Sequence, residues 1–471
     1  MQASWFQEMR SYTIALQFDP LIAKVSMKNL KPILTVKSGC AAERWGVTYW
    51  PLRKSPLSFR EMAGGTDRPT PGHAALSAGT TWDGERYELN AATAYYDRPD
   101  ILDAWYRMLH AATGPETLYQ SPQFFRHLID TTQGTQASYE LFIIRRRVDG
   151  SIVGCVPVRT LGRDLDFRLG PLSLFKRTMR ACQLLGSVPL LDPTEEGLTE
   201  FVVEQLLARY AKCEVLYMQA MPEEIGAAPP RCAGVSAYVL DGWRQCHTQP
   251  LPDSIDAYLQ KFSAKKRYNL SRQIRLLTAA AGALQVLRIE QPDEVATLLD
   301  AMADTEGAVV KPRDTEALRL DNLARHGLLL SYVIRCGDED VAFVLGSRSS
   351  SVWHIHKIVC QQKYMPLSVG TSAVHLAVLD VMANSAFQLI DYGYGTPNAE
   401  FRSTHVLKSR GHVLLHRSRS LTALLLKFHG RYNAMNEALI RYTKAARKWY
   451  VQRRQTGDKG VAKRNNAPKA P

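Results

Sequence analysis

The stretch that most constrains the fold is residues 352–395. It opens with an apolar, β-branched run over 352–360, which predicts a β-strand. A short loop containing Pro366 follows, and from Ser368 onward apolar residues recur at helical spacing, which predicts an α-helix. A further strand is expected at 387–390. This order of elements is typical of an α/β protein in which a helix connects neighbouring strands.

The start of the predicted helix is suited to an anion. Ser368 is a candidate N-cap, and Gly370 lets a ligand approach the backbone closely. The first N–H groups of a helix have no intrahelical partner, and together with the helix dipole they attract phosphate or pyrophosphate. The alternative is an ordinary helix N-terminus whose glycine serves geometry alone.

Composition limits the class of protein. At 471 residues, 45% of them hydrophobic, the chain can fill the cores of two domains. No apolar run is long enough to cross a bilayer, and Glu8, Arg10 and Asp19 interrupt any signal-peptide core. The eight cysteines are scattered without a CxxC pair, which favours reduced thiols. We therefore expect a cytoplasmic protein, at most peripheral to the inner face of a membrane.

The net charge of +14 is concentrated at one end of the chain. Residues 441–471 contain ten Lys or Arg and one acidic residue, Asp458. Such a tail is most often a solvated end. The alternative is a weak contact with an anionic membrane or with RNA.

The chain repeats one order of elements. A hairpin at 141–158, a strand at 183–186, a helix at 198–210 and a strand at 215–218 precede a second such series, which begins with a hairpin at 328–346. We expect two copies of one α/β unit. The expected divisions are a partly disordered N-terminal extension (1–90), a first half (91–245), a second half (250–415), and a C-terminal helix with a basic tail (416–471).

The two expected strand-to-helix loops differ in charge. The first, at 192–196, is acidic and contains a proline, so it would repel a pyrophosphate. The second is uncharged from Met365 to His375. A phosphorylated cofactor is therefore expected in the second half only.

Several sequence strings resemble a known family. They are KKRYNLSRQIR, AFVLG, WHIHKIV, PLSVGTSAVHLAVLD and IDYGYGTPNAEFR. This ordered set resembles the CelD or BioF-like acetyltransferases of the GNAT superfamily, whose tandem GNAT-like mixed-sheet folds are shared with Fem-type peptidyltransferases. The resemblance covers roughly residues 95–415. The family's Ser-Pro-Gly loop lacks its proline here, and its Tyr-Lys pair is replaced by Phe401–Arg402.

The resemblance implies transfer of an acyl group from acetyl-CoA or another acyl-CoA to an amine of an amino sugar, amino acid or polysaccharide precursor, without a metal. The strand before the helix would pair with the pantetheine arm, and the helix start would hold the pyrophosphate. The expected cofactor-binding residues are Ile358, Val359, Cys360, Ser368, Val369, Gly370, Thr371 and Ser372. The expected substrate- or phosphate-binding residues are Lys265, Arg267, Asn269, Arg272 and Arg402, although a solvated basic face is the alternative for the first four.

Acyl transfer to an amine needs a base and a proton donor. The candidates are Asp391 at the end of the last strand, His356 on the cofactor strand, and Tyr394 as donor to the thiolate. Asp391 has the alternative of capping a turn, and His356 that of a structural histidine. We place His354 and His356 on opposite sides of their strand.

Two other functions remain open. One is a Fem-like transferase that takes an aminoacyl group from charged tRNA. The other is a non-catalytic GNAT-fold module in exopolysaccharide assembly. The acceptor, the acyl chain length and the oligomeric state are not readable from the sequence.

Overall fold

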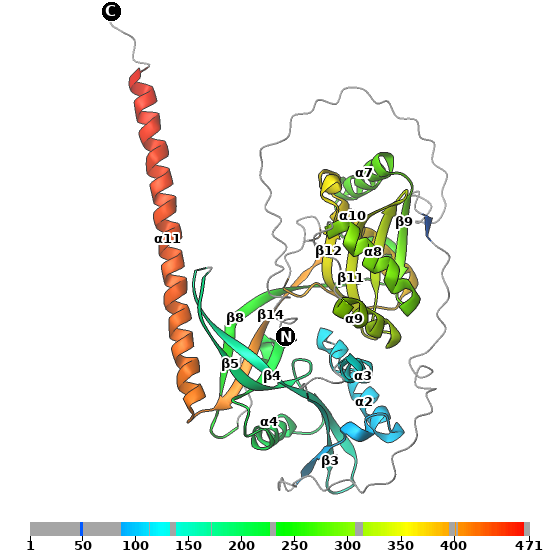
Figure 1. The fold of residues 1–471 in the computed structure, drawn as a ribbon, viewed down its shortest axis with the longest axis vertical. Helices are drawn as coiled ribbons and strands as arrows, with labels where there is room; N and C mark the ends of the chain where they lie inside the picture. The colour runs from blue at the N-terminus through cyan, green and yellow to red at the C-terminus, as the bar shows by residue number, and fades with distance from the viewer. Residues whose placement is uncertain are drawn as a thin grey trace, which may run out of the picture.

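The computed structural model describes residues 48–49 and 86–465, except 113, 132–137, 171, 227–231, 307–313, 395–400 and 402–403. Nearly all of the expected N-terminal extension lies outside the described residues. The described chain forms a mixed α/β fold around one large sheet, from which a long C-terminal helix runs outward (Figure 1). No helix in the described part is long and apolar enough to span a membrane.

The first half of the described chain runs from β2 through β8. Its elements follow in the order strand, helices, hairpin, strand, helix and strands. They are β2 (Tyr87–Ala91), η3 (Thr93–Tyr95), α2 (Pro99–Ala111), η4 (Pro115–Leu118), α3 (Pro122–Thr131), β3 (Tyr139–Arg146), β4 (Ile152–Leu169), β5 (Leu172–Leu184), β6 (Leu190–Leu191), α4 (Leu198–Arg209), β7 (Val215–Pro222), α5 (Glu223–Gly226) and β8 (Val235–Pro250).

The second half, from α6 through β14, begins with two helices and then repeats that order. Its elements are α6 (Ile255–Gln260), α7 (Ala264–Ala281), β9 (Leu284–Ile289), η5 (Pro292–Glu294), α8 (Val295–Glu306), α9 (Asp314–Arg325), β10 (Ser331–Cys336), β11 (Glu339–Arg348), β12 (Val352–Cys360), η6 (Gln362–Leu367), α10 (Val369–Asn384), β13 (Leu389–Asp391) and β14 (Val406–Arg417). The helix α11 (Leu421–Asn465) follows, and the short β1 (Thr48–Tyr49) lies at the sheet edge beside β9.

The two halves exchange their last strands. The sheet order is β1-β9-β10-β11-β12-β13-β8-β14-β7-β5-β4-β3-β2, with β6 paired to β4. The last strand of the first half, β8, pairs with β13 of the second, and β14 of the second half pairs with β7 of the first. β8 and β14 also pair with each other along most of their length, which joins the halves into one continuous sheet.

Helices cover both faces of the second half's sheet. α7 and α10 pack on one face, where Trp353 and Ile355 of β12 are buried with Val374 and Leu376 of α10. On the other face, α8 and α9 share a core with α2 and α3 of the first half. α10 is buried on nearly all sides between residues 369 and 381, because it lies between the sheet and α7. This packing explains its lack of a polar face.

The elements predicted for residues 352–395 agree closely with the structure. β12 has the expected bounds, and α10 begins one residue after Ser368. The hairpin strands β4 and β5 are much longer than expected, because their outer parts extend beyond the compact core. There β4 alternates buried and more exposed residues, and β5 is exposed from Leu172 to Thr178. β8 runs through the expected division at 245–250.

The sequence predicts the packing of α11 only in part. Apolar residues at helical spacing from Leu421 to Leu439 predict a stripe that docks on the parent domain in the part before Leu439. Leu425 and Tyr432 of that stripe do pack there, but its members Leu421, Leu424, Phe428 and Met435 are exposed. The docked face is shifted around the helix, because the β4–β5 hairpin contacts it through hydrogen bonds as well as apolar packing. Its buried members are Thr422, Ala423, Leu426, His429 and Asn436.

Candidate functional site

The sheet splits between β12 and β13. These parallel strands pair only over Val352↔Leu389, Trp353↔Ile390 and His354↔Asp391. Beyond this point Tyr392 donates its N–H to the carbonyl of His247, which keeps that segment beside β8. β12 continues to residue 360 along β11. The other edge of residues 355–360 therefore pairs with no strand that the structure describes, and its backbone groups can receive an extended ligand.

The start of α10 lies directly beyond this open edge. Ser368 adopts a left-handed conformation, with φ 57° and ψ 37°, and its side chain makes no cap hydrogen bond. A Cβ built on Gly370 would lie 3.7 Å from the Cys360 Sγ, so the helix start and the strand end are in contact. Burial raises the pKa of the Cys360 thiol, which the Gly370 N–H partly opposes.

The predicted cofactor-binding residues at this place differ in the exposure of their side chains. Ser368 and Gly370 are half-buried at the helix start, whereas Val369, Thr371 and Ser372 turn their side chains into the protein. These last three can therefore offer a ligand only backbone groups. Ile358, Val359 and Cys360 are half-buried on the open strand. Their binding roles remain a prediction.

A buried charged cluster lies at the point where the strands separate. The His354 Nδ1 is 3.4 Å from the Asp391 Oδ2. The Arg410 guanidinium, from β14, lies 3.3 Å from Oδ1 and 3.2 Å from Oδ2 of the same carboxylate. All three side chains are less than a tenth exposed. The other ring nitrogen of His354, Nε2, has no hydrogen-bond partner among the described residues.

The environment keeps Asp391 ionised. Burial alone would raise its pKa, but the hydrogen bond from His354, the Arg410 charge and the Gly393 N–H together lower the pKa to about 2. The Gly393 N–H donates to Oδ1 at 3.2 Å, so the turn-capping role that we weighed is present as well. A carboxylate with this pKa is a weak base, and it is better suited to orienting His354 than to accepting a proton.

His356 lies on the same side of β12 as His354, which corrects our expectation of opposite sides. Their rings are stacked with centroids 6.5 Å apart. Residues two apart on a strand share a face. The His356 Nε2 is 2.6 Å from the Ser347 hydroxyl, and burial lowers the pKa of His356 to about 3. The ring is therefore neutral near pH 7.

β12 bulges at His356. Leu345 of β11 lies opposite Lys357, and the next residue, Gly346, lies opposite Ile355, so His356 has no register partner. Bulges of this kind free a backbone group and re-aim side chains, and they are frequent beside active sites.

Two tyrosines line the cluster from different sides. Tyr119 comes from the first half, and its ring meets His354 edge-on at a centroid distance of 6.0 Å. Burial raises the pKa of Tyr119 to about 12. Tyr394 lies toward β8 and β14, with the Arg244 guanidinium 4.7 Å from its ring centroid. Burial raises the pKa of Tyr394, so both phenols are neutral near pH 7.

The basic segment of α7 divides into two kinds of residue. The Arg267 guanidinium donates to the carbonyl of Phe262 at 2.7 Å and to that of Leu259 at 3.5 Å, so it ties α7 to the end of α6. Lys265 and Arg272 are exposed and Asn269 is half-buried, on a helix that packs against α10 and η6. Arg402 lies outside the described residues.

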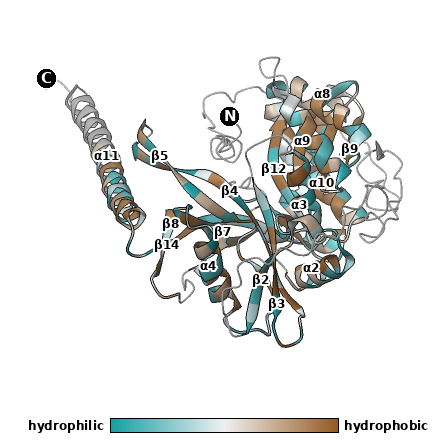
Figure 2. Cartoon of the chain, turned by 60° about the horizontal axis from the view of Figure 1, so that its bottom comes forward, coloured by the Kyte–Doolittle hydropathy of each residue, from teal (hydrophilic) through white to brown (hydrophobic). Residues whose placement is uncertain are grey.

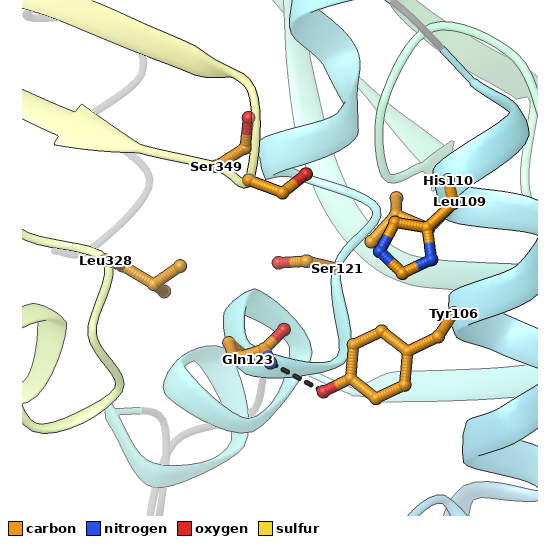
Figure 3. Close-up of a pocket in the computed structure, with 8 residues that line it drawn as sticks. Tyr106, Leu109, His110, Ser121, Gln123, Leu328 and Ser349 are labelled. Atoms are coloured by element: carbon orange, nitrogen blue, oxygen red, sulfur yellow. Dashed lines mark hydrogen bonds between the residues drawn. The ribbon is translucent and has the colours of Figure 1, made fainter. Parts of the chain in front are cut away.

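A small pocket lies between the halves at the far end of β12. It holds about 60 Å³, which is far too little for an acyl-CoA. Figure 3 shows Leu328 and Ser349 of the second half facing Ser121 and Tyr106 of the first. The Gln123 amide donates to the Tyr106 hydroxyl at 2.6 Å.

Sequence reasoning missed His354, Arg410 and Tyr119 as parts of one site. Tyr119 and Arg410 are far from β12 in the sequence, and only the register of the sheet brings them together. The one available signal was the position of His354, two residues from the histidine that we did select.

Some solved structures resemble the chain at low similarity. FemX aligns at 12% identity over 64% of this chain and 92% of that chain, with a TM-score of 0.45. A tandem GNAT protein from the clavulanic acid biosynthesis pathway aligns at 12% identity over 71% and 99%, with a TM-score of 0.41. The C-terminal domain of a putative lysylphosphatidylglycerol synthetase from Agrobacterium fabrum aligns at 11% identity over 70% and 95%, with a TM-score of 0.42.

No curated protein sequence matches the chain. One family model does match a part of it. Residues 264–402, from the start of α7 to just beyond β13, match the acetyltransferase (GNAT) domain. The matched segment contains the split between β12 and β13, the start of α10 and both members of the His354–Asp391 pair.

Proposed function

We propose that this protein is an acyl-CoA-dependent N-acyltransferase whose single reaction site lies in the second half. The observation that carries the proposal is the split between β12 and β13, with His354 and Asp391 at its apex. The open strand edge runs from the oriented imidazole of His354 at one end to the uncapped helix start beside Cys360 at the other. The match of residues 264–402 to the acetyltransferase (GNAT) domain supports this reading.

The donor would extend from the helix start along the open strand. The N–H groups at the beginning of α10 suit a pyrophosphate, and no acidic residue lies between Gln361 and His375 to oppose it. The backbone of residues 355–360 suits the amides of a pantetheine arm. Bound acyl-CoA supplies a thioester that is already activated, so the protein has to orient the amine and handle one proton.

His354 is the proposed base. Asp391 accepts the Nδ1 proton of the imidazole, which leaves a lone pair on Nε2, and that nitrogen has no partner among the described residues. An amine placed at the split would lose its proton to Nε2 as it attacks. Tyr119 closes the same space from the first half. Asp391 thus becomes the residue that orients the base, in place of being the base.

The remaining roles follow from the bulge and from Tyr394. An N–H group released by the bulge at His356 is the proposed donor to the thioester carbonyl oxygen, whose negative charge grows during attack. The neutral phenol of Tyr394 is the proposed proton donor to the departing thiolate. The acceptor is an amine of an amino sugar, amino acid or polysaccharide precursor, in keeping with the CelD or BioF-like resemblance.

Isothermal titration of the full chain with acetyl-CoA and with free CoA tests the proposal. We expect both to bind at one site per chain, and acetyl-CoA to be consumed when an amine library is added. The absence of binding to either ligand would refute the proposal. Turnover only with aminoacyl-tRNA would place the protein with the Fem-like transferases, and binding without turnover on any amine would favour the non-catalytic module.

A further inference from the structure

The outer part of the first half carries an apolar surface that the proposed reaction does not use. We name it the arm surface. It is formed by the tip of the β4–β5 hairpin and by one face of α11, which lie side by side at one end of the molecule (Figures 1 and 2). Its exposed apolar residues are Leu169, Leu172, Leu174 and Phe175 of the hairpin and Leu421, Leu424, Phe428, Met435, Leu439, Tyr442 and Trp449 of α11.

Specific contacts make the two elements one surface. The buried Phe167 ring lies 5.7 Å, centroid to centroid, from both Phe175 of the hairpin and Phe428 of the helix. The Gly170 N–H, at the hairpin tip, donates to the Asn436 Oδ1 at 3.0 Å. His429 is 3.1 Å from the carbonyl oxygen of Asp166. The hairpin therefore lies along about two turns of α11.

The apolar residues of α11 form a continuous stripe. Residues 421, 428, 435, 442 and 449 are Leu, Phe, Met, Tyr and Trp, and their exposed fractions lie between 58% and 85%. Seven-residue spacing keeps them on one side of the helix, over a length of about 42 Å. Exposed apolar surface on this scale usually marks a contact with a partner or a lipid.

The charge beside the stripe decides which occupant fits. Residues 421–449 contain six Lys or Arg and one acidic residue, Glu437. The hairpin adds the exposed cations Arg168, Lys176 and Arg177, of which Arg168 is paired with Asp166 and Arg177 with Glu214. The exposed cations of the arm surface are Arg168, Lys176, Arg177, Lys427, Arg431, Arg441, Lys444 and Lys448.

We propose that the arm surface docks on an anionic lipid bilayer, with the apolar stripe at the headgroup boundary and the cations on the phosphates. Phe, Tyr and Trp together with long cationic side chains suit this boundary. A second copy of the chain fits less well. It would bring the two cationic helices together, and Leu425 and Tyr432, two of the large apolar residues that alternate with the stripe, already pack on the core that contains Phe167 of the hairpin.

Vesicle flotation of the full chain tests the proposal. We expect binding to phosphatidylcholine vesicles that contain phosphatidylglycerol, weaker binding to pure phosphatidylcholine, and loss of the difference at high salt. Failure to bind either vesicle at low salt overturns the proposal. So does binding to RNA without binding to vesicles.

Variants on α11 and on the hairpin test which residues of the arm surface contact the vesicle. Leu424→Glu/Met435→Glu on α11 and Leu174→Glu/Phe175→Glu on the hairpin should each weaken vesicle binding at least about tenfold. Lys427→Gln/Arg431→Gln should weaken it roughly 30-fold on anionic vesicles. The control is Leu318→Glu on α9, where a leucine of similar exposure lies outside the arm surface.

Circular dichroism of each variant confirms that it is folded before flotation. If the Leu174→Glu/Phe175→Glu variant binds vesicles as tightly as the parent protein, the hairpin is not part of the docking surface. If the Leu424→Glu/Met435→Glu variant is a monomer where the parent protein is a dimer, and its vesicle binding is unaffected, the stripe belongs to a contact with a second copy of the chain.

Discussion

The two halves share one topology but differ at the position where the sheet divides. In the first half, the last parallel pair between β5 and β7 is Leu184↔Met218, and both side chains are buried in an apolar core. In the second half the equivalent pair is His354↔Asp391. The same place in the same arrangement of strands therefore holds two apolar residues in one half and an oriented imidazole in the other.

The strands beyond that pair differ as well. β5 ends at Leu184, and the chain turns back to form β6, so no extended edge follows the division. β12 continues through residue 360 and leaves one edge open. In the first half the loop before the helix is fastened by Glu195, which bonds to Tyr87 and Arg146. The comparison teaches that the two halves share a sheet topology, whereas only the second half, among the described residues, combines the open strand edge with the polar pair on which the proposed function rests.

The largest expected effect concerns the helix start. Gly370→Asp should lower acyl-CoA affinity at least about 100-fold, because its carboxylate would repel the pyrophosphate that the helix dipole attracts. The fold should tolerate the change, since the added Cβ meets only Cys360 at an ordinary distance of 3.7 Å. Isothermal titration measures the loss.

The matched change in the first half is Thr194→Asp, which should leave affinity unchanged. Equal losses from the two variants would remove the asymmetry between the halves. Gly370→Ala serves as the steric control and should bind nearly as well as the parent protein.

The next effect concerns the polar pair at the division. His354→Gln should lower kcat about 10²- to 10⁴-fold, which is the range for loss of a general base, with little change in acyl-CoA affinity. His356→Gln should cost less, because the low pKa of His356 leaves it uncharged and bonded to Ser347. Steady-state kinetics compares the two. A larger fall in kcat for the His356→Gln variant would indicate that His356, and not His354, is the general base.

Asp391→Asn should reduce turnover and keep acyl-CoA affinity within a few-fold of the parent protein. Removing the carboxylate also leaves the buried Arg410 without its ion pair, at a cost of about 3–5 kcal/mol in unfolding free energy. Kinetics at low temperature and denaturant unfolding measure the two effects separately. If the variant does not fold at any temperature, the role of Asp391 is structural alone.

The same carboxylate predicts a dependence of stability on pH. The pKa of Asp391 is lowered to about 2 in the folded protein, below its value of about 3.9 in an unfolded chain. The stabilisation is therefore fully present above pH 4 and is lost as the pH falls toward 2. Unfolding free energies at pH 5 and pH 3 should differ less in Asp391→Asn than in the parent protein. An equal difference would assign the acid sensitivity to other groups.

The smallest effect concerns the end of the chain. Among the described residues α11 packs on β4 and β14, and neither element carries the open strand edge. Truncation after Thr443 should therefore leave kcat on a small soluble acceptor within about twofold of the full chain. Because much of the arm surface precedes this point, the truncated protein should also retain part of its vesicle binding. A large fall in kcat would show that the tail reaches the reaction site.

Local sequence patterns were enough to predict individual strands, helices and turns. The β-branched run of β12 and the long apolar segment of α10 needed no information from elsewhere, because a buried strand and a buried helix differ in length and composition. The turn residues Asp149 and Gly150 likewise marked the hairpin of the first half. The charge contrast between the two strand-to-helix loops was also visible.

The site could be predicted only in part, since its chemistry depends on register. Asp391 was selected for its place at a strand end, but its partners are set by the pairing of β12 with β13 and by the insertion of β14. No pattern near Arg410 indicates that its guanidinium would meet a carboxylate on another strand. The bulge at His356 follows from one extra residue on β12 relative to β11, which sequence periodicity does not encode.

The exchange of β8 and β14 makes the halves inseparable. A fragment that ended before β8 would leave β7 with a bare edge, and a fragment that began after β8 would leave the same defect on β13. Exposed edges of this kind recruit other chains and aggregate. Although the chain repeats one order of elements, a cleavage that separates the halves would therefore expose an unpaired strand edge in each piece.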